Sequence, residues 1–189
     1  QCFYCHNKHL QRGETRVSTD RVLARIEENR FLVSGVVFSG GECTEQIRAL
    51  RRLAADCRDL GLKVGIHTNG AFPENARNLI GEVDKVALDV KAPWTHYPAV
   101  TGVTIARQVE ESLALYREAH AAGTLPEFEV VHTVVRGREA DVPAVAAVAE
   151  GVNLVLQQGI WGRVEPLTLV EFQTLADPLG RPVKIRTAG

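Results

Sequence analysis

The amino-acid sequence predicts an α/β fold, a partial (β/α)6 barrel of parallel strands with outer helices, and three observations support this class. Short apolar runs rich in β-branched residues alternate with helical patterns along the chain, and the connections between them are short. The strand-like runs are apolar throughout, which is typical of parallel strands buried on both faces. Each run also ends in a polar or glycine-containing cluster, and the chemistry of β/α barrels sits at those carboxyl ends.

The first part of the chain shows two helical patterns on either side of a strand. The polar stretch 18–20 can cap the first helix. Val33 to Phe38 then indicates a buried strand that ends in a tight turn at Ser39-Gly40-Gly41-Glu42. Thr44 can cap the second helix, and Gly61 follows it as a stop signal. The apolar face of this helix consists of Ile47, Leu50, Leu53, Ala54, Cys57 and Leu60.

The rest of the chain continues the alternation. Strands are expected at 63–66, 83–90, 128–135 and 153–157, with 183–186 as a further candidate. Helices are expected after Pro73, from Thr104 and from Val142. One more strand before Cys2 would complete the six strands of the partial barrel, so we expect the first strand to precede this sequence.

Composition limits the possible function. The 189 residues suit a single domain, 1–189, and a hydrophobic content of 45% supplies a sizeable core. The net charge of −1 creates no field that would attract nucleic acid or anionic lipid. No apolar run approaches the length of a membrane span. We therefore expect neither nucleic acid nor a membrane as a partner.

Four cysteines, Cys2, Cys5, Cys43 and Cys57, are too few for a disulfide scaffold in a chain of this length. Thiols used for metal or redox work in the cytoplasm are the expected alternative. Cys57 shares a helical face with Leu53 and Leu60, so its predicted role is packing.

The loop 1–9 contains the pair Cys2-x-x-Cys5, and the chain has no methionine. We interpret the sequence as a piece that begins inside a metal-binding loop. The pair alone leaves three possibilities open: half of a zinc site, a thiol–disulfide pair, or part of a cluster site.

The other motifs are weak one by one. Gly40-Gly41-Glu42 after a strand can be a plain turn, although glycines also let the backbone approach a ligand. His67-Thr68-Asn69-Gly70 is typical of a strand-to-turn exit. Lys91 at a strand end, beside Asp89, can be a solvated lysine or can bind a carboxylate.

The combination is more specific than its parts. A CxYCHN loop, then SGGE, TNG and DVK in this order at β/α spacing resembles the radical S-adenosylmethionine superfamily, from Cys2 to about Gln158. Within it the chain is most similar to the activating enzymes of glycyl radical enzymes. Their cluster loop is CxxxCxxC, so the resemblance places its first cysteine four residues before Cys2.

The resemblance implies a cofactor pair, a [4Fe-4S] cluster and S-adenosylmethionine. Three thiolates leave one iron without a protein ligand, and the family binds S-adenosylmethionine there and cleaves it to a 5′-deoxyadenosyl radical after one-electron reduction. Cys2 and Cys5 are the implied metal ligands. The implied cofactor-binding residues are Tyr4, His6, Gly40, Gly41, Glu42, Asp89, Lys91 and Gln157. Gly40, Gly41 and Glu42 would receive the methionine ammonium, Lys91 its carboxylate, and Gln157 the ribose.

The resemblance also implies the partners. The substrate would be a glycyl radical enzyme, of the class III ribonucleotide reductase or pyruvate formate-lyase type, and the electron donor a flavodoxin or ferredoxin. The chain departs from the family pattern at three positions, where Cys43, His67 and Val131 replace a usual proline, aspartate and basic residue. These changes bear on the partner more than on the cofactor.

Two alternatives from other classes remain. One is a radical enzyme acting on a small molecule, as 7-carboxy-7-deazaguanine synthase does. The other is a non-catalytic metal-binding module or fragment. A chain that lacks one cluster ligand can itself be inactive even where the complete protein is active.

Overall fold

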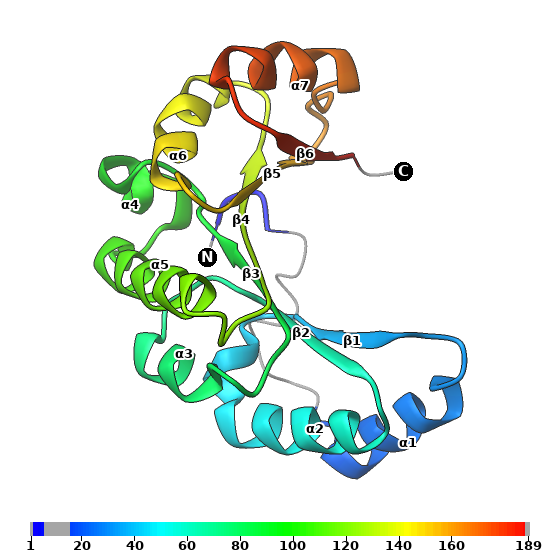
Figure 1. Cartoon of the computed structure of the whole chain (residues 1–189). Coiled ribbons are helices and arrows are strands. Elements are labelled where there is room, and N and C mark those ends of the chain that lie inside the picture. Colours follow the sequence, from blue (N-terminus) through cyan, green and yellow to red (C-terminus); the bar gives the residue numbers. More distant parts are fainter. Residues whose placement is uncertain (1, 6–15, 188–189) are drawn as a thin grey trace. The chain divides into compact units, whose positions relative to one another are not determined.

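The computed structural model describes residues 2–5 and 16–187, and its six strands form one sheet in the order β1-β2-β3-β4-β5-β6. The strands are β1 (Gly35–Phe38), β2 (Lys63–Thr68), β3 (Lys85–Asp89), β4 (Glu127–Val134), β5 (Asn153–Gln158) and β6 (Val183–Arg186). The pairs β1–β2, β4–β5 and β5–β6 run parallel, and helices connect successive strands (Figure 1). The predicted α/β class and the parallel sheet are confirmed.

The sixth strand comes from the end of the chain. Val183–Arg186 pairs with β5, with Leu154 opposite Val183 and Gln157 opposite Arg186. The five earlier strand predictions are also confirmed, with ends shifted by one or two residues. The strand expected before Cys2 lies outside this sequence and stays a prediction.

The helices are α1 (Thr19–Asn29), α2 (Ile47–Asp59), α3 (Pro73–Leu79), α4 (Tyr97–Thr101), α5 (Ala106–Ala121), α6 (Val142–Val148) and α7 (Leu169–Ala176). Ser18 caps α1 by accepting a hydrogen bond from the Arg21 N–H at 3.3 Å, as the sequence predicted. The sequence interpretation missed α4 and α7. For α7 the signal was present, because Thr168 and Glu171 form a capping box ahead of it.

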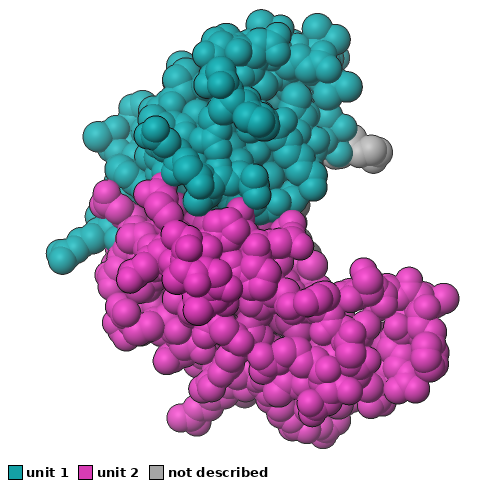
Figure 2. Space-filling model, viewed as in Figure 1, with its two compact units in different colours: residues 1–6, 88–107, 129–189 teal, residues 7–87, 108–128 magenta. Residues whose placement is uncertain are grey.

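The chain divides into two compact units, shown in different colours in Figure 2. Unit 1 comprises residues 1–6, 88–107 and 129–189, and unit 2 comprises residues 7–87 and 108–128. We describe each unit by itself. The single domain expected over 1–189 stays a prediction.

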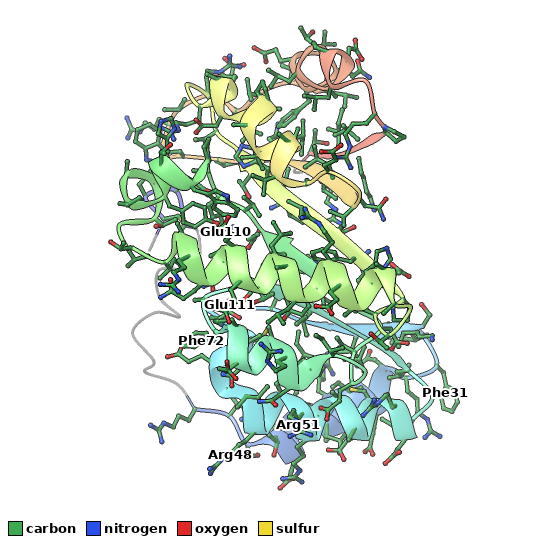
Figure 3. The ribbon with its side chains drawn as sticks, turned by 60° about the vertical axis from the view of Figure 1, so that its left-hand side comes forward. Phe31, Arg48, Arg51, Phe72, Glu110 and Glu111 are labelled. Carbon is green, nitrogen blue, oxygen red and sulfur yellow. The ribbon has the colours of Figure 1, made fainter. Side chains whose placement is uncertain are left out.

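In unit 2, α2 packs against β1 and β2 and buries the face that its sequence period predicted. Leu50, Leu53, Ala54 and Cys57 are all buried, and Cys57 is completely covered. The predicted packing role of Cys57 is confirmed. The opposite face of α2 carries Arg48 and Arg51, which point away from the sheet (Figure 3).

The β1 edge of unit 2 is more open. No residue of α1 is buried, and a groove of about 470 Å³ lies between α1 and β1, lined by Val22, Ile26 and Val36 among others. Phe31, in the turn between α1 and β1, is 86% exposed (Figure 3). Apolar surface on an edge strand and its covering helix is typical of a place where another strand adds.

In unit 1, β4 and β5 form the centre. Val130, Val134, Leu154 and Leu156 are buried, as expected for parallel strands covered on both faces. Among the described residues, no helix has the length and apolar character needed to cross a lipid bilayer.

Candidate active site

In unit 2, the turn after β1 exposes backbone. Gly40 has φ +122°, a conformation that residues with side chains rarely adopt. A Cβ built at Gly41 meets no atom within 4 Å. The two glycines therefore leave their backbone accessible, as a cradle for a ligand requires.

Glu42 holds this turn together. Its Oε1 accepts hydrogen bonds from the Thr44 N–H at 3.0 Å, the Thr44 hydroxyl at 2.5 Å and the Thr68 hydroxyl at 2.7 Å. Its Oε2 accepts from the Asn69 N–H at 2.7 Å. The carboxylate thus joins the exits of β1 and β2. Because Oε2 accepts a single one of these four hydrogen bonds, it can still accept another from a ligand ammonium.

These contacts correct the predicted helix cap. Thr44 is not the N-cap of α2. A short 3-10 helix, Cys43–Gln46, precedes α2, and Glu42 is the N-cap of that short helix. The carboxylate reaches the Thr44 N–H, a position that a cap side chain commonly satisfies. Glu42 therefore has a structural role that the sequence interpretation missed.

Cys43 stands where the family usually has proline, and it is buried. Its thiol donates to the His67 carbonyl oxygen, with 3.3 Å between sulfur and oxygen. Burial and, to a smaller extent, the neighbouring Glu42 carboxylate raise the pKa of Cys43 to about 12. A thiol that stays protonated is a poor metal ligand.

The exit of β2 forms a compact polar turn. The Thr68 hydroxyl accepts from the Gly70 N–H at 3.1 Å, and Asn69 Oδ1 accepts from the Ala71 N–H at 2.9 Å. Gly70 has φ +71°, as is typical of the glycine of an Asn-Gly turn, and the predicted strand-to-turn exit is confirmed. The turn is thereby fixed in place as the support for Glu42.

In unit 1, Cys2 and Cys5 stand in a tight turn in which the Cys5 N–H donates to the Cys2 carbonyl at 3.0 Å. Both cysteines are half-buried and neither forms a disulfide. The Phe3 N–H donates to the Val100 carbonyl at 3.4 Å, and the Phe3 ring packs edge-on against Trp161 at 4.9 Å between centroids. The loop is therefore anchored at Phe3, between its two thiols. His6 lies outside the described residues.

Tyr4 is buried in this loop, and its hydroxyl has no geometric hydrogen-bond partner among the described residues. Burial raises the pKa of Tyr4, and nearby Cys2 and Asp89 raise it further. Cys2, a predicted metal ligand, and Asp89, a predicted cofactor residue, therefore both lie near the Tyr4 side chain.

The exit of β3 carries an ion pair. Lys91 Nζ lies 2.8 Å from Asp89 Oδ2, and both side chains are mostly buried. The Tyr97 hydroxyl accepts from the Lys91 N–H at 3.2 Å and donates to the Asp89 carbonyl at 3.4 Å. The solvated alternative for Lys91 is therefore wrong, since 17% of its side chain is exposed.

Gln157 is half-buried near the end of β5, opposite Thr133 on β4 and Arg186 on β6. Its place at a strand end agrees with the sequence. A contact with ribose stays a prediction.

Unit 1 thus gathers Cys2, Tyr4, Asp89 and Lys91, and unit 2 gathers Gly40, Gly41 and Glu42. Tyr97 is the residue that sequence analysis missed. It lies in the stretch between Pro93 and Gly102, where no periodic pattern indicated a helix.

The residues present fit a cluster loop in part. Cys2 and Cys5 can supply two thiolates from one turn, and the three-cysteine loop of the family needs one more. Within 2–5 and 16–187, no three His, Cys, Asp or Glu side chains gather as a metal site. Among the described residues, this loop therefore supplies two thiols.

Comparison with known proteins identifies the family of the chain. The model of the Radical SAM superfamily matches residues 1–143. A provisionally named glycyl-radical enzyme activating enzyme of Methanocaldococcus jannaschii is 35% identical over 101 residues, which cover 51% of this chain and 41% of the relative. The chain thus spans less than half the length of this curated relative.

Solved structures agree on the fold. Streptococcus suis SuiB matches 100% of this chain with a TM-score of 0.74 at 12% identity, over 46% of its own chain. A domain of the pyruvate-formate lyase-activating enzyme from Bacteroides vulgatus matches 83% of this chain and 100% of its own, with a TM-score of 0.63 at 16% identity. With the family model covering most of the sequence, these matches lead to one conclusion: the chain belongs to the radical S-adenosylmethionine superfamily.

Proposed function

We propose that the complete protein uses a [4Fe-4S] cluster and S-adenosylmethionine to generate a glycyl radical on a partner enzyme. The relative from Methanocaldococcus jannaschii supports the activating role through its name. The observation that carries the proposal is that, within unit 1, α4 contacts both the Cys2–Cys5 loop, through Val100 and Phe3, and the Asp89–Lys91 turn, through Tyr97. A metal-binding loop beside a buried charge pair suits a cofactor that is both metal-bound and zwitterionic.

Each group has a defined task in this proposal. Cys2 and Cys5 would hold two irons of the cluster, and Lys91 would pair with the methionine carboxylate as a charge-assisted donor. Glu42 and the backbone of Gly40 and Gly41 accept the ammonium. When bound, the reduced cluster and S-adenosylmethionine supply a 5′-deoxyadenosyl radical, which removes a hydrogen atom from a carbon.

The substrate we propose is a glycine on a loop of a class III ribonucleotide reductase or pyruvate formate-lyase type of partner. Glycine lets its Cα approach closely because it has no side chain. Abstraction of one Cα hydrogen atom leaves a glycyl radical and 5′-deoxyadenosine. The electron comes from a flavodoxin or ferredoxin, and we place the protein in the anaerobic cytoplasm, where thiols stay reduced.

The experiment is electron paramagnetic resonance on the complete, cluster-loaded protein mixed anaerobically with candidate partners. We expect a doublet from a glycyl radical that depends on S-adenosylmethionine and on the partner's glycine, and that a Gly→Ala partner variant abolishes. Cleavage of S-adenosylmethionine with turnover of a small molecule, and no protein radical, would refute the glycyl assignment. Absence of iron and sulfide in the complete protein would refute both radical functions.

A further inference from the structure

The short helix α4 and the turn before it contact the exit of β3 within unit 1. Tyr97, the first residue of α4, is buried, and its ring packs against Trp94 at 5.5 Å between centroids. Its hydroxyl bonds the Lys91 N–H and the Asp89 carbonyl at 3.2 and 3.4 Å. The Tyr97 hydroxyl thereby bonds to the backbone of Asp89 and of Lys91, the two charged residues that flank Val90.

The same helix contacts the cysteine loop. The Val100 carbonyl accepts the hydrogen bond of the Phe3 N–H, between the two thiols in sequence. The Thr101 hydroxyl donates to the Tyr97 carbonyl at 2.7 Å, which fixes the two ends of α4 to each other. Gly102, with φ +70°, then ends the helix in the left-handed conformation. α4 is thus a short rigid connection between the loop of Cys2 and Cys5 and the turn of Asp89 and Lys91.

We propose that Tyr97 is a positioning residue, which sets the Asp89–Lys91 ion pair at a fixed place relative to the cysteine loop. In this proposal S-adenosylmethionine binds the cluster and Lys91 at the same time. A change in the position of Lys91 relative to the cysteine loop therefore lowers the affinity for S-adenosylmethionine. Tyr97 acts through Lys91 and Asp89 and makes no contact with the cofactor in this proposal. The inference rests on the proposed cofactor role of Lys91.

The variant Tyr97→Phe isolates this role. It keeps the buried ring and removes only the hydroxyl, so the Lys91 N–H loses its acceptor. A hydrogen bond of this kind contributes about 0.5–1.5 kcal/mol, which corresponds to about two- to twelvefold in an equilibrium constant. We expect S-adenosylmethionine to bind about three- to tenfold more weakly, on the basis of the same range.

Tyr116→Phe is the matched control. Tyr116 on α5 is as buried as Tyr97, and its hydroxyl has no hydrogen-bond partner among the described residues. Removing that hydroxyl leaves no other group unpaired. We expect unchanged affinity for S-adenosylmethionine in this variant.

The experiment uses the complete, cluster-loaded protein under anaerobic conditions. Iron per protein and melting temperature are measured first, then S-adenosylmethionine is titrated by calorimetry and by the change it causes in the paramagnetic resonance spectrum of the reduced cluster. For Tyr97→Phe we expect a full iron content, a melting temperature lowered by about 2–4 °C for the lost hydrogen bond, and the same spectral change at a higher S-adenosylmethionine concentration.

Three outcomes would overturn the inference. One is unchanged affinity in Tyr97→Phe while Lys91→Ala weakens binding, which leaves the proposed function standing. Another is an equal loss of affinity for S-adenosylmethionine in Tyr97→Phe and Tyr116→Phe. The third is loss of iron from Tyr97→Phe, because Tyr97 would then support the loop itself. Unchanged affinity in Lys91→Ala would instead refute the cofactor role of Lys91, on which the inference rests.

Discussion

Lys91 Nζ lies 2.8 Å from Asp89 Oδ2, two residues away at the exit of one strand, with 17% and 27% of the two side chains exposed. A mostly buried ammonium next to a single carboxylate keeps donors for a second anionic group, because an ammonium has three. In the proposed function, these donors bind the carboxylate of S-adenosylmethionine.

The first prediction concerns Lys91→Ala in the complete, cluster-loaded protein. Loss of a charge-assisted hydrogen bond costs about 1.5–3 kcal/mol, so S-adenosylmethionine should bind about ten- to hundredfold more weakly while the cluster remains. Calorimetric titration measures this. The control is Lys63→Ala, because Lys63 makes an equally short ion pair with Asp84, 2.8 Å long, at the start of β2. Equal affinities in both variants would contradict the role of Lys91.

The second prediction separates Gly41 from Glu42. Glu42→Ala should lower the free energy of unfolding by about 2 kcal/mol, because it removes a cap and leaves Thr68 and Asn69 without their acceptor. Gly41→Val should leave that free energy nearly unchanged, since its Cβ meets no atom within 4 Å, yet weaken S-adenosylmethionine binding. Urea unfolding and calorimetry measure the two effects. If Gly41→Val binds the cofactor normally, the turn after β1 is not the ammonium site.

The third prediction concerns the cysteines. Cys5→Ala should abolish the visible absorption of the iron cluster, because a cluster ligand is lost. Cys57→Ala should retain it, at a cost of about 1 kcal/mol for the small cavity left in the core under α2. Iron and sulfide content of the complete protein measures both. Retention of iron in Cys5→Ala together with loss in Cys57→Ala would reverse the assignment.

The fourth prediction concerns pH and His132, which is buried on β4 with its Nδ1 2.9 Å from the Val90 carbonyl oxygen. Burial lowers the pKa of His132 from 6.5 to about 4, although Val90 and Asp141 oppose the shift. The unfolded chain therefore binds more protons than the folded chain between these two values, so stability falls as pH falls.

From about pH 7 to about pH 5, this histidine should remove roughly 1–2 kcal/mol of stability. His132→Asn should flatten that part of the pH profile, even if it lowers stability throughout. Urea unfolding of the unsubstituted protein and of His132→Asn at several pH values provides the measurement. A slope unchanged in His132→Asn would show that other groups cause it.

The sequence by itself determined the strand–helix alternation, the strand-end turns and the burial of Cys57. The spacing of apolar residues, the glycines and the Asn-Gly pairs indicate local backbone geometry, because that geometry depends mainly on neighbouring residues. The order of the CxYCHN, SGGE, TNG and DVK motifs also indicated the superfamily, which the family match over residues 1–143 confirms.

Only the tertiary structure decided which hydrogen-bond donor pairs with which acceptor. It assigned the cap to Glu42 instead of Thr44, engaged Glu42 with Thr68 and Asn69, and placed the Tyr97 hydroxyl on Lys91 and Asp89. These partners stand up to 27 residues apart in the chain, as for Glu42 and Asn69. A hydrogen bond depends on distance and direction between two atoms, and burial depends on all surrounding elements. Neither quantity follows from local sequence pattern.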